Sequence, residues 1–336
     1  MKEFYLPKNY QSTLGLLETQ VAIKLVKDTF EHQLANELQL TRVSAPLYVF
    51  KDSGLNDDLN GIERPVEFDL LELPNRSVQV VQSLAKWKRL ALKQYGIECH
   101  KGLYADMNAI RRDEILDNLH SSYVDQWDWE KVISKQDRTL DYLKSTVKKI
   151  VQALYHTNQI VHQHYPQLPL LPLKDVYFIS TQELEDLYPN LSPKEREHAI
   201  CKEKKTVFIL QIGDQLKSGE RHDGRAPDYD DWSLNGDLLV WYPLLNRSIE
   251  LSSMGIRVDK ASLLSQLAKS NAMYKLNYPF HQLLLCNKLP LTMGGGIGQS
   301  RICMVLLQKA HIGEVQASIW DDQTHAIAEQ HHVHLL

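Results

Sequence analysis

Hydrophobic and polar residues follow two rhythms along the chain, one with a period of three to four residues and one with a period of two. Residues 12–40 carry Ile23, Val26 and Phe30 on the longer period, and residues 138–164 continue the same pattern. Such a repeat places apolar side chains on one face of a helix, so both segments are predicted to be long amphipathic helices. Shorter helices are predicted for residues 84–95, 193–204 and 279–287, and after Asp259.

Residues 123–130 show the other rhythm, in which large apolar side chains alternate with polar ones. Successive side chains of a strand point to opposite faces, so this segment is predicted to have one packed face and one face that lines a site. Strands are predicted for residues 44–50, 78–81, 103–112, 122–132, 206–212, 237–244 and 248–258.

The predicted strands run in antiparallel-looking groups separated by helical insertions, which favours an α+β fold. No internal repeat and no low-complexity linker divides the chain. We therefore predict one catalytic domain over residues 1–336, with an N-terminal helix at about 12–40, a core at about 41–320 and a helical insertion at about 137–205.

Composition narrows the class of protein. The 336 residues are 43% hydrophobic and 24% charged, as is ordinary for a globular chain, and the net charge is −4. An acidic balance predicts no nucleic-acid partner, and the apolar runs are too short for a membrane span. The start of the chain does not resemble a signal peptide, and the four cysteines form no CxxC pair. We expect a cytoplasmic protein with neither nucleic acid nor membrane among its partners.

Residues 294–298 hold four glycines in five positions, and Arg301 and an apolar run follow them. Glycines in a turn before a helix let the free N–H groups of the helix approach an anion, and Arg301 would add a planar cation. The alternative is a tight turn into a core helix without a ligand. A dinucleotide-binding loop fits less well because Arg301 stands where its third glycine belongs. A phosphate-binding Walker loop is excluded because no Gly-Lys-Ser/Thr follows.

Two charged loops are candidates for a functional role. Residues 51–63 are rich in Asp, Asn and Gly and include Asp57. Residues 213–236 form a longer segment, dense in charge and without a regular pattern, which is more typical of a lid than of a plain connector. Each loop could also be simply a solvated acidic segment.

Four charged residues share a strand-and-turn context. Arg111 lies at a strand end, Asp237 and Glu250 lie on neighbouring predicted strands, and Arg301 follows the glycines. Arginines neutralise phosphate oxygens, and one or two carboxylates can hold a hydrated Mg²⁺ that also binds phosphate. The set is therefore what a nucleoside triphosphate with Mg²⁺ requires. The alternative is that these are separate surface charges.

Several strings of residues resemble known motifs. Residues 109–114 and 126–130 resemble motif 2 of class II aminoacyl-tRNA synthetases of the aspartyl subgroup, and residues 294–301 resemble their motif 3. Pro46 stands where motif 1 has its interface proline. The closer resemblance is to the ammonia-dependent asparagine synthetases of the A type, the aspartate–ammonia ligases. It rests on residues 83–89, 123–130, 225–232, 250–257 and 294–301.

This resemblance implies a fold, a reaction and an assembly. The fold would be an antiparallel sheet flanked by helices, as in class II synthetases, and the protein would be a homodimer. The side-chain carboxylate of aspartate would attack the α-phosphate of ATP, giving β-aspartyl-AMP and pyrophosphate. Ammonia would then displace AMP and yield asparagine.

The resemblance also implies an ATP site. Arg111 would bridge the α-phosphate and the substrate carboxylate, and Arg301 would lie against adenine and the γ-phosphate. The Mg²⁺ ligands would be Asp237 and Glu250. The remaining ATP-binding residues would be Tyr123 or Val124, packed on adenine, together with Ser253, Gly296 and Gly298.

For aspartate, the resemblance implies a clamp of Lys88 and Arg257, with Ser83, Gln126 and Asp128 nearby. A synthetase activates the α-carboxylate, whereas an asparagine-forming enzyme must activate the side chain. The clamp would then take the α-carboxylate, so the substrate would sit reversed.

Two acidic roles follow from the substrates. A carboxylate must meet the ammonium group of aspartate, and the candidates are Asp57 and Asp128. Ammonium must lose a proton before it attacks, and Asp57 and Asp230 are the candidates for that step. Free ammonia is the expected nitrogen source because no N-terminal cysteine could act as a glutaminase nucleophile.

Two rival interpretations remain. A tRNA synthetase would need an anticodon-binding domain ahead of motif 1, where only about forty helical residues are available. A non-catalytic synthetase-like subunit would be expected to lose motif residues, yet Arg111, Glu250 and Arg301 are present.

Overall fold

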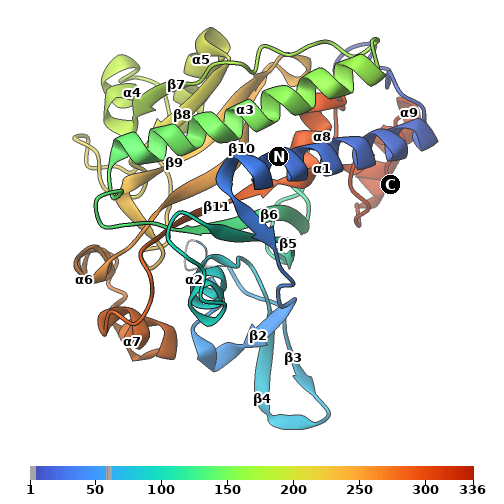
Figure 1. Cartoon of the computed structure of the whole chain (residues 1–336). Coiled ribbons are helices and arrows are strands. Elements are labelled where there is room, and N and C mark those ends of the chain that lie inside the picture. The colour runs from blue at the N-terminus through green and yellow to red at the C-terminus, as the bar shows by residue number, and fades with distance from the viewer. Residues whose placement is uncertain (1–4, 58, 60–62) are drawn as a thin grey trace.

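The computed structural model of the chain describes residues 5–57, 59 and 63–336. Within them, the centre is an eight-stranded sheet with the order β1-β5-β6-β11-β10-β9-β8-β7 (Figure 1). Its strands are β1 (Leu40–Arg42), β5 (Gly102–Ile110), β6 (Tyr123–Val132), β7 (Tyr177–Ser180), β8 (Thr206–Leu210), β9 (Asp230–Tyr242), β10 (Arg247–Arg257) and β11 (Thr292–Gly298).

The sheet is antiparallel in its interior and parallel at both edges. The pairs β5–β6, β6–β11, β11–β10, β10–β9 and β9–β8 are antiparallel, whereas β1–β5 and β7–β8 are parallel. Parallel neighbours need a long crossover connection, and each edge pair is joined by a segment that contains other elements. The α+β class and the expected antiparallel sheet flanked by helices are confirmed, and the structure adds a parallel pair at each edge.

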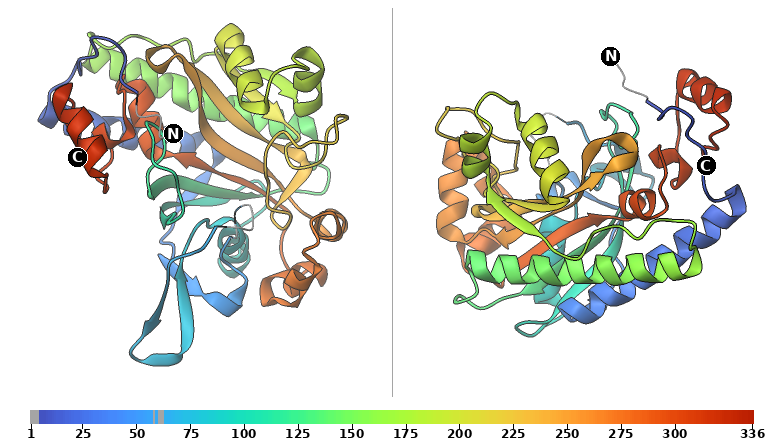
Figure 2. Two further views of the ribbon diagram at one scale, coloured as in Figure 1. Left: turned by 180° about the vertical axis from the view of Figure 1, so that it is seen from behind. Right: turned by 90° about the horizontal axis from the view of Figure 1, so that it is seen from above.

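Two long helices lie side by side across one face of the sheet, as Figures 1 and 2 show. They are α1 (Leu16–Leu38) and α3 (Leu140–His164), which confirms both long predicted helices. The buried residues of α1 include Ala22, Val26, Phe30, Leu34 and Leu38, an unbroken repeat of four. This repeat keeps one apolar stripe against the sheet, where the ring centroid of Phe30 lies 4.8 Å from that of Trp127 in β6.

The alternation of β6 sorts its side chains as predicted. Trp127 and Trp129 are fully buried in the same hydrophobic cluster as the buried stripe of α1. Asp128 and Glu130, at the alternate positions, belong to the opposite face and interact with Lys88. One strand therefore joins the hydrophobic core to a polar site.

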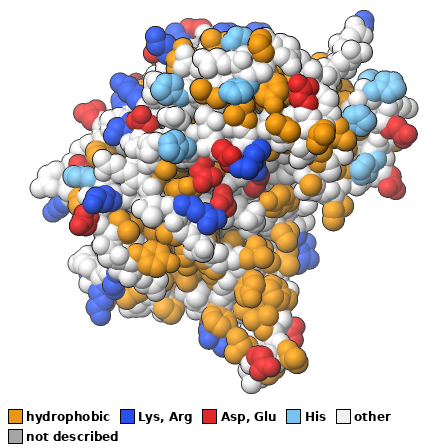
Figure 3. All heavy atoms as spheres, turned by 45° about the vertical axis from the view of Figure 1, so that its right-hand side comes forward, with side chains coloured by type: hydrophobic (Ala, Val, Ile, Leu, Met, Phe, Trp, Pro, Cys, Tyr) orange, Lys and Arg blue, Asp and Glu red, His pale blue; other side chains and the backbone are white. Residues whose placement is uncertain are grey.

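A small sheet of the order β2-β4-β3 projects from the body below the central sheet (Figure 1). It consists of β2 (Tyr48–Phe50), β3 (Glu67–Leu70) and β4 (Leu73–Val80). β2 and the end of β4 were predicted, whereas β3 and the rest of β4 were not, because Pro74 and the polar residues beside it hide the strand pattern. Exposed Phe68 and Leu71 belong to this hairpin, and hydrophobic side chains gather on the lower part of the surface in Figure 3.

The remaining helices surround the sheet. The predicted helix of residues 193–204 is confirmed as α5 (Pro193–Lys204), where Ser192 caps the first turn in a capping box with Glu195. Among the described residues, no helix combines the length and the apolar character that a bilayer crossing needs. The others are α2 (Ala85–Gln94), α4 (Thr181–Leu187), α6 (Lys260–Lys269), α7 (Pro279–Leu285), α8 (Gln299–Leu306) and α9 (Asp322–Gln330).

Two predicted segments differ in the structure. The glycines at 294–298 belong to strand β11 and pair with both β6 and β10, so the predicted glycine turn is wrong. The predicted loop of residues 213–236 is too long, because β9 begins at Asp230, whose backbone pairs with Arg257 of β10. Neighbouring strands supply the pairing in both cases, and the local pattern of polar and glycine residues does not reveal it.

We predict that Phe30→Ala lowers the free energy of unfolding by about 3–5 kcal/mol, because it removes a fully buried ring between α1 and β6. Urea denaturation followed by circular dichroism measures the change. Leu187→Ala is the control, since Leu187 is 53% exposed and its loss should change stability by less than about 0.5 kcal/mol. Equal losses for the two variants would contradict the assigned packing of α1.

Candidate active site

A polar cavity of about 460 Å³ lies on the face of the central sheet that carries Gln126 and Asp128. The sequence-predicted residues converge there from β6, β10, β11 and several loops, and only Lys88 and Asp237 of the set do not line it. The predicted residues that line the cavity are Asp57, Ser83, Arg111, Tyr123, Val124, Gln126, Asp128, Asp230, Glu250, Ser253, Arg257, Gly296, Gly298 and Arg301.

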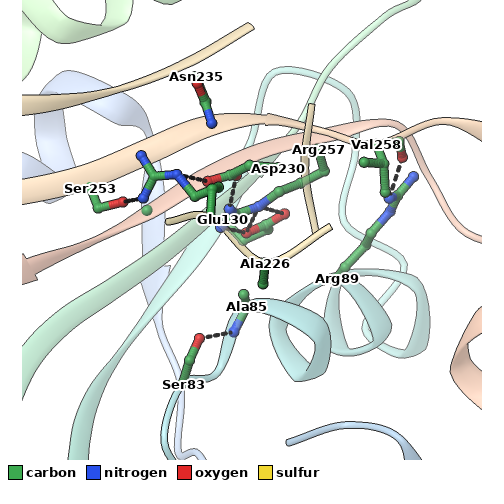
Figure 4. Close-up of polar contacts among 12 residues, drawn as sticks. Ser83, Ala85, Arg89, Glu130, Ala226, Asp230, Asn235, Ser253, Arg257 and Val258 are labelled. Atoms are coloured by element: carbon green, nitrogen blue, oxygen red, sulfur yellow. Dashed lines mark hydrogen bonds and ion pairs between the residues drawn. The ribbon is translucent and has the colours of Figure 1, made fainter. Parts of the chain in front are cut away.

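A buried ionic network forms the floor of this cavity. Arg257 of β10 donates to the carboxylate of Glu130 on β6 from Nε at 3.0 Å and from Nη2 at 2.7 Å. Its Nη1 donates to Asp230, and Figure 4 shows the guanidinium between the two carboxylates. Burial alone would lower the pKa of Arg257. The carboxylates of Glu130 and Asp230 together raise this pKa by more than burial lowers it, so the guanidinium stays charged.

The network explains the glycines of β11, which lies between β6 and β10. A Cβ at Gly294 would clash with Glu130 and would lie 2.7 Å from Nη2 of Arg257. A Cβ at Gly296 would clash with the side-chain amide of Gln126. The glycines therefore leave room for side chains of neighbouring strands to cross over β11, which is a close approach that only glycine permits.

One N–H group in the first turn of α8, the helix that follows β11, already has a carboxylate partner. The N–H of Ser300 donates to Oδ1 of Asp125 at 3.1 Å, and the side chain of Gln316 donates to the same oxygen at 3.2 Å. A carboxylate of the protein thus already neutralises this end of α8. Asp125 of β6 thus occupies one position that the local sequence left open, and an anionic ligand at the other N–H groups of this turn stays a prediction.

Lys88 of α2 lies beneath the cavity with no exposed surface. Its ammonium forms an ion pair with Asp128 and donates to the carbonyl oxygens of Trp129 at 2.9 Å and Gly295 at 3.2 Å. Burial lowers the pKa of Lys88, and the carboxylates of Asp128 and Glu130 oppose that shift. Three acceptors satisfy the three N–H donors of Lys88, so the side chain orients Asp128.

Arg225 lies in the segment before β9 and belongs to the motif string of residues 225–232, but it was not among the predicted site residues. Its Nη2 donates to Asp237 at 2.6 Å, its Nη1 donates to the hydroxyl of Ser253, and its Nε lies 3.9 Å from Asp230. It ties the loop to three strand positions. Its place in residues 225–232, a string rich in Asp, was the signal that could have identified it.

Asp237 of β9 and Glu250 of β10 are the predicted metal ligands, and they lie on paired strands. Burial raises the pKa of Asp237 to about 6, with Arg225 lowering it and Glu250 raising it again. Neighbouring carboxylates repel each other, and a divalent cation would relieve that repulsion. This donor set fits Mg²⁺, which prefers carboxylate and water oxygens.

Two further arginines of the cavity retain hydrogen-bonding capacity. Nε of Arg111 is buried and has no hydrogen-bond partner among the described residues, and the guanidinium lies 4.0 Å from Glu114. Arg301, in the first turn of α8, donates from Nη1 to the carbonyl oxygen of Glu250 at 2.9 Å. A buried donor without a partner is costly, so Arg111 is suited to receive an anionic ligand.

The two acidic candidates, Asp57 and Asp230, occupy different environments. Asp230 is 1% exposed and contacts the guanidinium of Arg257. Asp57 is also buried, and its Oδ1 accepts a hydrogen bond from the N–H of Leu59 at 3.1 Å. Its carbonyl oxygen accepts one from Gln82 at 2.8 Å. Asp230 is thus committed to the ionic floor, whereas Asp57 belongs to the rim of the cavity.

A family model described as aspartate-ammonia ligase matches residues 17–332 of the chain. An aspartate–ammonia ligase of Clostridium perfringens (strain 13 / Type A) is 59% identical over 336 residues, covering 100% of both chains. One from Pediococcus pentosaceus is 53% identical over 334 residues, covering 99% of this chain and 100% of the relative.

Solved structures with a similar fold are tRNA synthetases. The asparaginyl-tRNA synthetase of Pyrococcus horikoshii, complexed with asparaginyl-adenylate, aligns with a TM-score of 0.64 at 15% identity. The match covers 90% of this chain and 70% of that chain. An aspartyl-tRNA synthetase of Entamoeba histolytica aligns with a TM-score of 0.59 at 14% identity, covering 91% and 59%. These matches confirm the class II synthetase fold.

We predict that Gly294→Ala lowers the free energy of unfolding by about 3–5 kcal/mol, because its Cβ forces Glu130 away from Arg257 and breaks a buried ion pair. Chemical denaturation measures the loss. Gly15→Ala is the control, since nothing lies within 4 Å of its Cβ and a helix cap contributes only about 1 kcal/mol.

A double-mutant cycle tests the cause. On the background of Glu130→Ala, the same glycine substitution should cost less than it does in the wild type, because the carboxylate that it displaces is gone. Additive losses would show that Gly294 does not act through Glu130.

Proposed function

The chain belongs to the aspartate–ammonia ligase family, so it is an enzyme that makes asparagine from aspartate and ammonia with ATP, and we propose that it does so through β-aspartyl-AMP in the cavity described above. One observation carries this proposal: Arg111, a half-buried cation whose buried Nε has no partner among the described residues, lines the same cavity as the ionic floor around Arg257. An anionic nucleotide and an amino acid can thus meet in one space. The proposal goes beyond the overall reaction in one respect, which is that ATP transfers AMP, rather than phosphate, to aspartate.

In the first step, the side-chain carboxylate of aspartate attacks the α-phosphorus of ATP, and pyrophosphate leaves. Negative charge grows on the α-phosphate oxygens, and Arg111 stabilises it as a donor held in place before the reaction. Arg301 holds the γ-phosphate and one side of adenine. The other nucleotide contacts are proposed for Tyr123, Val124, Ser253, Gly296 and Gly298, all of which line the cavity.

We assign the Mg²⁺ site to Asp237 and Glu250. Their proximity, together with the raised pKa of Asp237, supports this assignment. When bound, Mg²⁺ would supply charge neutralisation for the phosphates. Arg225 already holds one of the two carboxylates in place, because its Nη2 donates to Asp237 at 2.6 Å.

For aspartate, we propose that Arg257 receives the α-carboxylate and that Asp128 faces the ammonium group, with Ser83 and Gln126 completing the pocket. This orientation leaves the side-chain carboxylate free to point at the α-phosphate. Lys88 contributes through Asp128, with which it forms an ion pair beneath the cavity. It acts as a positioning residue, a refinement of the clamp role expected from the resemblance.

For the second step, we propose that Asp57 captures ammonium and accepts a proton, so that neutral ammonia attacks the acyl carbon and AMP leaves. Asp230 already neutralises Arg257, which makes it a weaker attractor of a further cation. Asp230 then serves to hold Arg257 and the loop that carries Arg225.

The oligomeric state, the partners and the cellular location of the enzyme are also proposals. The exposed side chains of Leu16, Leu17 and Val21 form an apolar surface on α1 that favours a homodimer. The net charge of −4 supports the absence of nucleic acid among the partners. We propose that the enzyme works in the cytoplasm, where ATP and aspartate are available. Sedimentation equilibrium tests the dimer, and a monomer at micromolar concentration would refute it.

The direct test mixes the protein with ATP, aspartate, ammonium and Mg²⁺, and measures every product. We expect asparagine, AMP and pyrophosphate in equal amounts. ADP and phosphate would exclude the adenylate, and a requirement for tRNA would point to a synthetase.

We predict that Arg111→Ala and Arg301→Ala each lower the rate of ATP–pyrophosphate exchange by about 10²–10³-fold, because a fixed donor to developing or bound phosphate charge is lost. Exchange of labelled pyrophosphate into ATP measures this step alone. Arg112→Ala is the matched control, since Arg112 is the next residue but does not line the cavity. A near wild-type rate for either cavity variant would remove that arginine from the ATP site.

We predict that Asp57→Asn separates the two steps. One equivalent of pyrophosphate per active site should still be released, whereas asparagine should form slowly, because an amide cannot accept the proton. Rapid-quench assays with and without ammonium measure both steps. Higher pH, which supplies neutral ammonia, should restore part of the rate.

Asp230→Asn provides the comparison. It removes the partner of Arg257 and should lower both steps together, with no rescue at high pH. If Asp57→Asn behaves in the same way, Asp57 serves to bind aspartate or to order its loop, and the proton acceptor lies elsewhere.

A further inference from the structure

Three potential metal ligands meet on the surface at the ends of β5 and β6 that lie away from Arg111. Cys99 and His100 belong to the loop between α2 and β5, and Asp137 belongs to the loop between β6 and α3. One ligand atom of each lies within 4.8 Å of the other two. Within residues 5–57, 59 and 63–336, no other group of three or more His, Cys, Asp or Glu side chains comes this close. None of the three lines the cavity.

The position of His100 is fixed by its main chain. Its φ of 67° lies in the left-handed region, which residues other than glycine seldom adopt. Its N–H donates to the carbonyl oxygen of Val132 at 2.9 Å. This conformation brings Nε2 to 2.9 Å from Oδ2 of Asp137. The backbone of one loop thus holds the imidazole against the carboxylate of the other.

Asp137 is oriented from its other side by Ser134, which donates to Oδ2 from its N–H at 2.8 Å and from its hydroxyl at 2.7 Å. The described hydrogen bonds of its carboxylate all fall on Oδ2, so Oδ1 keeps its lone pairs available. Outer hydrogen bonds of this kind are what orient the ligands of a metal site. Burial raises the pKa of Asp137, but the hydrogen bonds from Ser134 and His100 outweigh it and lower the pKa.

The kind of donor atom selects the metal. Cys99 is a free, exposed thiol, and a thiolate with an imidazole favours a zinc-type ion over a hard cation such as Mg²⁺. The ammonium of Lys131 also lies near the group: burial and the neighbouring Lys149 lower its pKa, and Asp137 and Cys99 only partly oppose that shift. A nearby positive charge repels every metal cation. An ion that binds here therefore needs a strong bond to the sulfur of Cys99, which a zinc-type ion forms and Mg²⁺ does not.

We propose that Cys99, His100 and Asp137 bind a divalent ion of the zinc type, with water as a fourth ligand. Tetrahedral zinc with bonds of about 2.0–2.3 Å places its ligand atoms about 3.4–3.6 Å apart. The imidazole and carboxylate need to separate slightly from 2.9 Å, and the thiol has to approach by rotation about its Cα–Cβ bond. Binding releases the thiol proton, and the imidazole of His100 binds the ion through Nε2 as the tautomer that carries its proton on Nδ1. The ion would then connect the two loops.

The test uses the full-length protein after removal of metal with a chelator. Titration with Co²⁺ should produce the charge-transfer absorption of a cobalt–thiolate bond, at one ion per chain. Zn²⁺ should abolish that absorption, and competition with a chromophoric chelator should give its affinity. Binding should also protect Cys99 from alkylation and raise the melting temperature.

Three substitutions should each weaken Zn²⁺ binding by about tenfold or more: Cys99→Ser, His100→Asn and Asp137→Asn. Asparagine tolerates the left-handed backbone of position 100, so His100→Asn removes the ligand without straining the loop. Cys286→Ser is the matched control, because Cys286 is also a free, exposed cysteine but lies outside the group. Circular dichroism of the metal-free variants confirms that each one folds, and asparagine synthesis with Mg²⁺ should be unchanged in Cys99→Ser.

Two results would overturn the proposal. One is that no cobalt–thiolate band depends on Cys99. The band would then be absent from the wild type, or Cys99→Ser would retain it as fully as Cys286→Ser does. The other is an affinity that disappears when His331, His332 and His334 are replaced together. That result would assign the metal to the histidines near the C-terminus.

Discussion

The ion pair between Arg257 and Glu130 is the constraint on which the centre of this protein depends. The two residues belong to β10 and β6, which are separated by β11, so the pair has to cross over the intervening strand. Burying two charges is costly unless their geometry is close to ideal, and a side chain at Gly294 would prevent that geometry. The glycines of β11, the order of the strands and the charge of the cavity floor are therefore parts of one arrangement.

Around this pair, the cationic side chains fall into two groups that differ in their hydrogen-bond partners. Arg257, Lys88 and Arg225 donate to carboxylates, hydroxyls and carbonyl oxygens of the protein. Arg111 and Arg301 keep donors for a ligand. The first group belongs to the buried ionic floor, and we propose that the second supplies the positive charge that an adenylating enzyme would need where phosphate charge develops. Such a division lets the site exist before its substrates arrive.

The same floor bears on the choice of substrate group. A synthetase and an asparagine-forming enzyme can share one fold and yet activate opposite ends of an amino acid. With Arg257 fixed by Glu130 and Asp230, the cavity offers one guanidinium at a set place for a carboxylate. If Arg257 receives one carboxylate of aspartate, as we propose, the other one would be directed to the α-phosphate. The orientation of the substrate, more than a change of catalytic residues, would then decide which product forms.

The sequence by itself determined the family, and it determined those helices and strands whose patterns involve only residues close together in the chain. The repeat of four in α1, the capping box of α5 and the alternation of β6 each depend on residues close together in the chain. The motif strings carried the family and most of the residues that line the cavity. Tertiary structure decided the rest. The glycines at 294–298 look like a turn until Glu130 and Gln126 are seen to lie across them.

Lys88 looks like a substrate ligand until three acceptors from elsewhere in the chain surround it. The hairpin of β3 and β4, the parallel edge strands and the role of Arg225 also needed the three-dimensional arrangement. In each of these cases, the partner that fixes the conformation or satisfies the charge lies on a different strand or loop. Local sequence patterns contain no information about which distant side chain will supply that partner, because strand order and burial alone determine it.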